Sequence, residues 1–275
     1  MKRLALLTFL FLFALLFFSQ ASAIERLRLS TTTSTENSGL LNVLLPPFEK
    51  LFNLKVDVIP VGTGKALKMA ENGDVDVTLV HARSLEDRFV REGYGVNRRD
   101  LMYNDFVIIG PKSDPAGVRN AKDAPEAFKW VALKHATFIS RGDNSGTYVK
   151  EMEIWKMTGN KPSGNWYLEA GKGMGMVLIM CNEKRAYTLT DRATYLALSG
   201  TQKIDLPVLF EGDPMLFNPY GIIAVNPARH PHVDYVKAMA LIGWVTSRAG
   251  QKIIKEFGKD KFGKPLFVPV AVPNP

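Results

Sequence analysis

The stretch RLRLSTTTSTENSGLLNVLLPPFEKLFNLKVDVIPVGTGKALKMAENGDVDVTLV, residues 26–80, decides the fold class, because short β-type runs alternate in it with helical patterns. The expected elements are, in order, a strand around Leu27 and Leu29, a helix over 38–52, a strand over 55–61, a helix over 64–72 and a strand over 75–80. This βαβαβ order favours a parallel sheet with helices on both faces.

The alternation restarts beyond this stretch. A strand over 102–111 ends in the turn-rich segment KSDPAG, residues 112–117, and short strands and helices then alternate as far as residue 225. The tail over 233–257 has the pattern of two helices that could return to the first unit. The chain of 275 residues is long enough for about two domains with sizeable cores.

We therefore predict an α/β protein with two lobes, each a mainly parallel sheet flanked by helices, and a cleft between them. Residues 24–108 and 228–275 are expected to form lobe 1, and residues 109–227 lobe 2. Ligands of such sheets bind at the carboxyl ends of the strands, so the cleft is where a ligand is expected.

The first 23 residues have the pattern of a cleaved secretory signal peptide. Lys2 and Arg3 precede an apolar run over 4–18 that contains a single polar residue, Thr8, and the segment ends in Ala-Ser-Ala at 21–23. This run is shorter than the roughly 20 residues that span a bilayer, and small residues at its end suit a signal peptidase. The mature protein would begin near Ile24, outside the cytoplasm.

Composition excludes several classes of protein. With 46% hydrophobic and 23% charged residues, the chain is ordinary globular protein rather than a disordered, collagen-like or coiled-coil chain. The net charge of +8 falls to +6 without the two cations of the signal peptide, and the remaining cations are scattered among acids. This argues against a nucleic-acid surface and suits an anionic ligand. The single cysteine, Cys181, is expected in the core, and a monomer is the default.

Three strand ends carry clusters of hydroxyl and glycine residues that open a helix: STTTST at 30–35, VGTGK at 61–65 and SRGDNSGT at 140–147. A helix N-terminus offers unpaired backbone N–H groups, and short hydroxyl side chains add donors. Any one cluster could be an ordinary helix cap. Three of them in two lobes predict an oxyanion site.

Arg141 is the strongest candidate within these clusters, because it follows a strand and precedes a helix start. Its guanidinium could supply a fixed positive charge to a dianion. The alternative is a surface arginine paired with Asp143.

Catalysis is poorly supported. GDNSG at 142–146 lacks the G-x-S-x-G spacing of a nucleophile elbow, and VGTGK lacks the spacing of a P-loop. Among the four histidines, His230 and His232 are close in sequence but have no cysteine or carboxylate cluster nearby. We therefore predict no catalytic residue, no metal site and no cofactor.

Seven segments, in this order, make the chain resemble the periplasmic tungstate-binding proteins of ABC importers. They are TTTSTENSGLL (31–41), VGTGKAL (61–67), ENGDVDVTLVHA (71–82), EGYGVNRRDLMYNDFVIIGP (92–111), SRGDNSGT (140–147), AYTLTDRATY (186–195) and EGDPMLFNPYGIIAVNP (211–227). The resemblance covers essentially the whole mature chain. It implies a type II periplasmic-binding-protein fold, in which two lobes joined by a two-stranded hinge close over one tetrahedral oxyanion.

The resemblance also implies site residues, a ligand and a partner. The family's Thr-Thr-Thr-Ser motif falls on 31–34, and its binding arginine resembles Arg141. Thr63 is added by similarity to the related molybdate binders, and two hydroxyl residues open the helix beside the arginine. The expected binding set is Thr32, Thr33, Ser34, Thr63, Arg141, Ser145 and Thr147. The ligand would be tungstate, the partner an ABC importer permease and the location the periplasm.

Other functions stay open at this point. Tungstate and molybdate have almost the same size and charge, so only the resemblance favours tungstate. Sulfate is smaller, and a phosphate site would benefit from an acceptor carboxylate, for which Asp143 or Asp191 could serve. A secreted hydrolase with a Ser or Thr nucleophile lacks a recognisable base, and a sensory module would differ only in its partner.

Overall fold

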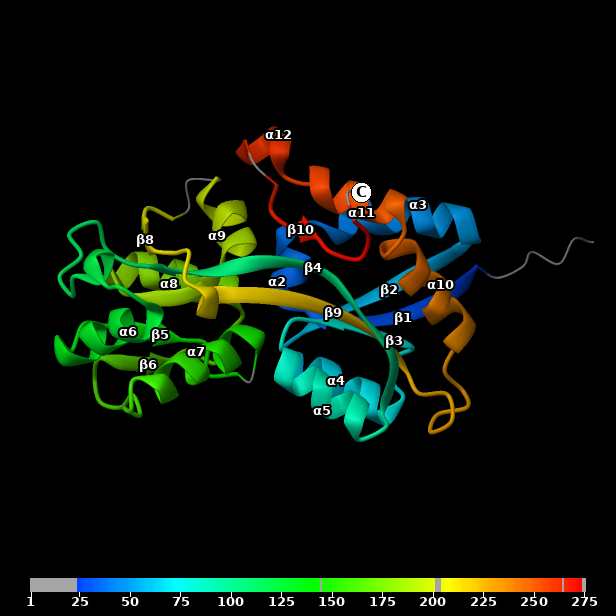
Figure 1. Cartoon of the computed structure of the whole chain (residues 1–275), viewed down its shortest axis with the longest axis horizontal. Coiled ribbons are helices and arrows are strands. Elements are labelled where there is room, and N and C mark those ends of the chain that lie inside the picture. Colours follow the sequence, from blue (N-terminus) through cyan, green and yellow to red (C-terminus); the bar gives the residue numbers. More distant parts are fainter. Residues whose placement is uncertain (1–23, 144, 201–203, 264, 274–275) are drawn as a thin grey trace, which may run out of the picture.

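The computed structural model describes residues 24–143, 145–200, 204–263 and 265–273. The predicted signal peptide, residues 1–23, lies outside the described residues. Two lobes lie side by side, and long strands run from one into the other (Figure 1). In the described part of the chain, no helix is both long enough and apolar enough to cross a membrane.

The first lobe is built on the βαβαβ order that the sequence predicts. Its elements are β1 (Glu25–Thr32), α2 (Thr33–Ser38), α3 (Leu41–Phe52), β2 (Leu54–Val61), α4 (Thr63–Asn72), β3 (Val77–Val80) and α5 (Arg83–Arg91). Strand β1 lies in the middle and is parallel to both β2 and β3, with Leu29 opposite Val58 and Val77. Because all three strands run the same way, their carboxyl ends lie at one edge of the sheet.

Two long antiparallel strands connect the lobes. They are β4 (Gly95–Ile109) and β9 (Phe217–Val225), which pair with each other over most of their lengths. Strand β9 also pairs with β3, with Thr78 opposite Ile223. The last residues of β4 instead pair with β7 (Thr188–Asp191) and β8 (Val208–Phe210). The sheet is therefore mixed, and β4 contributes a strand to each lobe.

The second lobe surrounds a smaller sheet. Its further elements are η1 (Val118–Asn120), α6 (Ala124–Leu133), β5 (Phe138–Ser140), α7 (Gly146–Met157), β6 (Tyr167–Glu169), α8 (Met174–Lys184), α9 (Arg192–Ser199) and η2 (Pro214–Leu216). Strands β5 and β6 are parallel, and a bridge between Phe138 and Tyr187 connects them to β7. Cys181 lies buried in this lobe, as expected.

The tail returns to the first lobe, as its sequence pattern predicts. It comprises α10 (Tyr235–Val245), α11 (Arg248–Glu256), α12 (Lys259–Phe262) and β10 (Val268–Pro269). Leu241, Ile242 and Ile254 pack into the same hydrophobic cluster as Leu27 and Leu29 of β1. A separate cluster around Phe128, Phe138 and Trp155 forms a core in the second lobe.

The lobe limits expected from the sequence stay a prediction, and one strand bears on them. Strand β9 lies inside the range 109–227, yet Gly221–Ala224 pair with β3 in the sheet of the first lobe. A strand of this kind is apolar whichever sheet it joins, so its hydrophobic pattern does not reveal its partner.

Candidate anion-binding site

The first lobe places four of the expected residues at the ends of parallel strands. Thr32 is the last residue of β1 and the N-cap of α2, and Thr33 and Ser34 form the first turn of that helix. Thr63 is the first residue of α4, directly after β2 and its N-cap Gly62. These residues come together because β1 and β2 are parallel neighbours.

The second lobe places the other three in one short segment. Arg141 follows the last residue of β5, Ser145 is the N-cap of α7, and Thr147 lies in the first turn of that helix. All three side chains are buried, and that of Arg141 is only 3% exposed.

The two sets of residues face each other across the boundary between the lobes. A Cβ atom built on Gly62 would lie 3.4 Å from the backbone oxygen of Asp143, and one on Gly173 would lie 3.6 Å from Thr33 Oγ1. The Thr194 hydroxyl, in α9, donates to the Ser34 backbone oxygen at 3.5 Å. The hydroxyl-rich turns therefore meet in the described structure, with the lobes in contact.

Four of the seven expected side chains offer a polar atom that is buried and has no hydrogen-bond partner among the described residues. These atoms are Thr33 Oγ1, Thr63 Oγ1, Thr147 Oγ1 and Arg141 Nε. Burying a polar group without a partner costs about 1–3 kcal/mol, so most such groups in proteins are paired. Here two of the unpaired atoms come from each lobe, and all four belong to groups that can donate a hydrogen bond.

The other three hydroxyl groups already have partners inside the protein. Thr32 Oγ1 accepts from the Thr35 backbone N–H at 3.2 Å, and Ser145 Oγ accepts from the Tyr148 backbone N–H at 3.2 Å. Both act as N-caps. The Ser34 hydroxyl lies 3.0 Å from His81 Nε2.

The sequence left two interpretations of Arg141 open, an anion-binding guanidinium and a surface arginine paired with Asp143, and the structure contains part of each. Its Nη2 donates to Asp143 Oδ2, so the pair with Asp143 exists. The arginine is nevertheless buried rather than at the surface. Asp143 Oδ1 also accepts from the Ser145 backbone N–H at 3.2 Å, which holds the loop between Arg141 and α7 in place. The hydrogen bond to Asp143 thus orients the guanidinium, while Nε has no partner among the described residues.

Asp191 is a buried carboxyl group close to these residues. Its Oδ1 accepts from the Thr194 backbone N–H at 2.9 Å, which caps α9, while Oδ2 has no partner among the described residues. Burial raises the pKa of Asp191, and the nearby charge of Arg141 opposes that effect.

His81 is a functional candidate that the sequence did not single out from the four histidines. It follows the end of β3 and is 4% exposed, and its ring stacks on Tyr220 with 4.7 Å between the ring centroids. Burial, aided by the charge of Arg141, lowers the pKa of His81 to about 4, although its contact with Asn218 opposes this. The only feature of the sequence that could have indicated a role for His81 is its position directly after an apolar strand.

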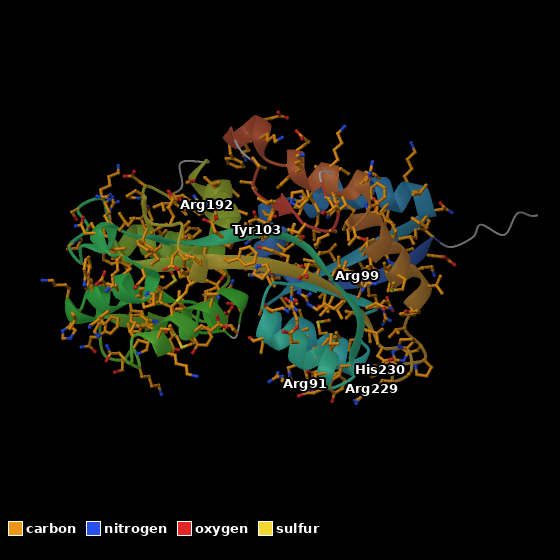
Figure 2. All side chains as sticks on the ribbon, viewed as in Figure 1. Arg91, Arg99, Tyr103, Arg192, Arg229 and His230 are labelled. Atoms are coloured by element: carbon orange, nitrogen blue, oxygen red, sulfur yellow. The ribbon has the colours of Figure 1, made fainter. Side chains whose placement is uncertain are left out.

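The remaining histidine pair lies elsewhere. His230 Nε2 contacts the backbone oxygen of Glu71 and His232 Nε2 that of Gly73, at the C-terminal end of α4. Figure 2 shows His230 beside Arg229 at the margin of the first lobe, away from the second lobe. Among the described residues, no group of three or more histidine, cysteine or acidic side chains could hold a metal ion.

Comparison with known proteins places this architecture in a family. The domain model of the PBP superfamily matches residues 19–249. The tungstate-binding protein TupA of Peptoclostridium acidaminophilum is 44% identical over 245 residues, which cover 88% of this chain and 85% of that protein. The chain belongs to this family of tungstate-binding proteins.

Two solved structures of tungstate proteins have the same fold. The tungstate ABC transporter structure from Geobacter sulfurreducens is 64% identical, with a TM-score of 0.78, over 85% of this chain and 99% of that one. The tungstate-binding protein TupA from Desulfovibrio alaskensis G20 is 45% identical, with a TM-score of 0.75, over 90% of this chain and all of that one. The family resemblance inferred from the sequence is confirmed.

Proposed function

We propose that this chain is the substrate-binding component of an ABC importer, and that it captures tungstate as a tetrahedral oxyanion between its two lobes. The observation that carries the proposal is a set of four buried donor atoms, from both lobes, that have no hydrogen-bond partner among the described residues: Thr33 Oγ1, Thr63 Oγ1, Arg141 Nε and Thr147 Oγ1. Membership of the tungstate-binding family supports the identity of the anion.

The donor set suits a fully deprotonated dianion. Tungstate presents four oxygens that only accept hydrogen bonds, and hydroxyl and guanidinium groups can all donate. Arg141 adds one positive charge in a buried setting, where water screens it little. The function needs no catalytic residue and no cofactor, because the anion is bound and released unchanged.

Engagement of both lobes explains how binding is coupled to closure. An anion held by Thr33 and Thr63 alone gains further donors only when Arg141 and Thr147 approach from the other lobe. The ligand therefore binds the closed form more tightly and shifts the population toward it. Strands β4 and β9, which run between the lobes, are where the backbone would bend. The closed form would be the one that a permease recognises.

The proposal also includes where in the cell the mature chain acts. The sequence pattern of residues 1–23 supports export through a cleaved signal peptide, so the mature chain would act in the periplasm. A monomer with one site per chain is the simplest arrangement, because the four donors all come from one chain.

Isothermal titration calorimetry tests the proposal. The chain without residues 1–23, purified free of oxyanions, is titrated with tungstate, molybdate, sulfate and phosphate in a buffer that contains no phosphate. We expect tight one-to-one binding of tungstate, weaker binding of molybdate and no heat from sulfate. A response to phosphate without one to tungstate would assign the site to a protonated anion, with Asp191 Oδ2 as its acceptor, and would refute the proposal.

A further inference from the structure

His81 occupies a position between the expected anion site and the strands that join the lobes. Its Nε2 lies 3.0 Å from the Ser34 hydroxyl, in the first turn of α2. Its Nδ1 lies 2.9 Å from Oδ1 of Asn218, in β9. Asn218 Nδ2 in turn donates to Asn104 Oδ1, in β4, at 2.6 Å. One chain of side-chain hydrogen bonds therefore connects α2 to both connecting strands.

The direction of these hydrogen bonds follows from the amide of Asn218. Because its Nδ2 donates to Asn104, its Oδ1 faces His81, and an amide oxygen can only accept. With the amide in this orientation, Nδ1 of His81 carries the ring proton. A neutral imidazole has one such proton, so Nε2 is an acceptor, and the low pKa of this buried ring agrees with the neutral form.

The Ser34 hydroxyl must then donate to His81 Nε2. A serine hydroxyl has a single proton, so in this arrangement it has none to offer an oxyanion. Thr33 differs from Ser34 in this respect, because its Oγ1 is buried without a partner. Two adjacent hydroxyl residues of the same turn thus have different roles.

We propose that His81 is a positioning residue for anion binding, which accepts the Ser34 hydroxyl proton and so holds the first turn of α2 with Thr33 directed at the ligand. Ser34 is then an anchor of the turn rather than a side-chain donor to the anion. The inference rests on the proposed function, because it concerns the same site.

The turn needs such an anchor because α2 has only six residues. Short helices have little stability of their own, and their conformation depends on tertiary contacts. The cap from Thr32 connects the turn only to the end of β1, which directly precedes it in the chain. The contact between Ser34 and His81 attaches it to the end of β3.

Two substitutions of His81 separate its two hydrogen bonds while removing the ring in both. In His81→Gln the terminal amide replaces Nε2 and can still accept from Ser34. In His81→Asn the shorter amide replaces Nδ1 and can still donate to Asn218, but it does not reach Ser34. Both variants lose the stacking on Tyr220, so they are matched in that respect.

The experiment measures tungstate affinity by calorimetry for the parent, His81→Gln, His81→Asn, Ser34→Ala and the double variant Ser34→Ala/His81→Asn. Thermal unfolding without ligand accompanies each titration. We expect Ser34→Ala and His81→Asn to weaken binding by a similar factor, roughly five- to tenfold, as for one lost hydrogen bond. The double variant should be no weaker than His81→Asn, and His81→Gln should stay within about threefold of the parent.

Three outcomes would overturn the inference. A loss in Ser34→Ala with none in His81→Asn would make Ser34 a direct donor to the anion. Losses that add in the double variant would show that the two residues act independently. Equal losses in His81→Gln and His81→Asn would assign the effect to the ring rather than to the bond with Ser34. Failure of the parent to bind tungstate would instead refute the proposed function.

Discussion

Arg141 is the one residue of the expected site that brings a full positive charge, and its side chain is buried. We expect Arg141→Ala to weaken tungstate binding ten- to a hundredfold, because a hydrogen bond to a charged group contributes about 1.5–3 kcal/mol. Calorimetry measures the change. Arg185→Ala, which removes an exposed arginine of the same lobe, is the matched control and should leave affinity unchanged. Equal affinity in parent and Arg141→Ala would remove Arg141 from the site.

The hydroxyl groups of Thr63 and Thr147 should each contribute a neutral hydrogen bond. Valine has nearly the same shape as threonine but no hydroxyl, so Thr63→Val and Thr147→Val should each weaken binding by roughly two- to tenfold. Thr78→Val is the control, because Thr78 Oγ1 is also buried without a described partner but lies within β3. That variant should keep its affinity. If all three variants bind tungstate equally well, the unpaired hydroxyls do not mark the ligand.

The first residue of α7 lies at a contact between the two lobes, so a substitution there tests whether the lobes close on the ligand. Gly146 is its first residue, and a Cβ atom there would lie 2.8 Å from His81 Cε1 and 2.9 Å from the His81 backbone oxygen. Because His81 belongs to the other lobe, Gly146→Ala should oppose the approach of the lobes without disturbing either one. We expect a loss of tungstate affinity of roughly tenfold or more, since binding selects the closed form.

Small-angle X-ray scattering distinguishes this effect from a lost donor. The parent should become more compact when tungstate is added, and Gly146→Ala should do so only at higher tungstate concentrations. Gly175→Ala, in α8, is the control, because its Cβ would make only ordinary contacts at 3.6 Å with Asn37 and Leu198. Parent-like affinity and compaction in Gly146→Ala would show that this contact does not limit closure.

Stability of the whole molecule should depend on pH through a buried carboxyl in the second lobe. Glu151 accepts hydrogen bonds from Tyr167 and Trp155, and burial raises its pKa to about 7 from an ordinary value of 4.5. Between these pH values the folded chain binds more protons than the unfolded one, so this group lowers stability as pH rises. His81 acts in the opposite direction between pH 4 and 6.5, because its pKa is lowered.

The substitution Glu151→Gln separates the contribution of Glu151 to the pH dependence of stability from that of His81. The free energy of unfolding of the variant relative to the parent should increase by about 3 kcal/mol between pH 4.5 and pH 7.5, as expected for a shift of this size. Urea denaturation at the two pH values measures it. Glu153→Gln, on the same helix but half exposed, should show no such change. A constant difference between Glu151→Gln and the parent would mean that Glu151 titrates normally.

Much of the fold could be predicted because it is encoded locally. The alternation of strands and helices over residues 26–80 follows from hydrophobic periodicity, and the structure confirms it. The resemblance to the tungstate-binding family likewise depended on short motifs and is confirmed. The clusters at 30–35, 61–65 and 140–147 were visible as hydroxyl and glycine residues at strand ends, so the expected residues of the site could be named.

Neither the pairing of the strands nor the acceptor to which each hydroxyl group donates its proton is encoded locally. Thr33 and Ser34 are adjacent and chemically alike, and only the packing of β3 beside β1 brings His81 to one of them. The pairing of β9 with β3 and β4 places Asn218 behind that histidine. Local sequence specifies which backbone and side-chain groups are available, because periodicity and capping act over a few residues. Which of those groups stay unpaired for an anion depends on contacts between residues far apart in the chain, and these exist only in the folded molecule.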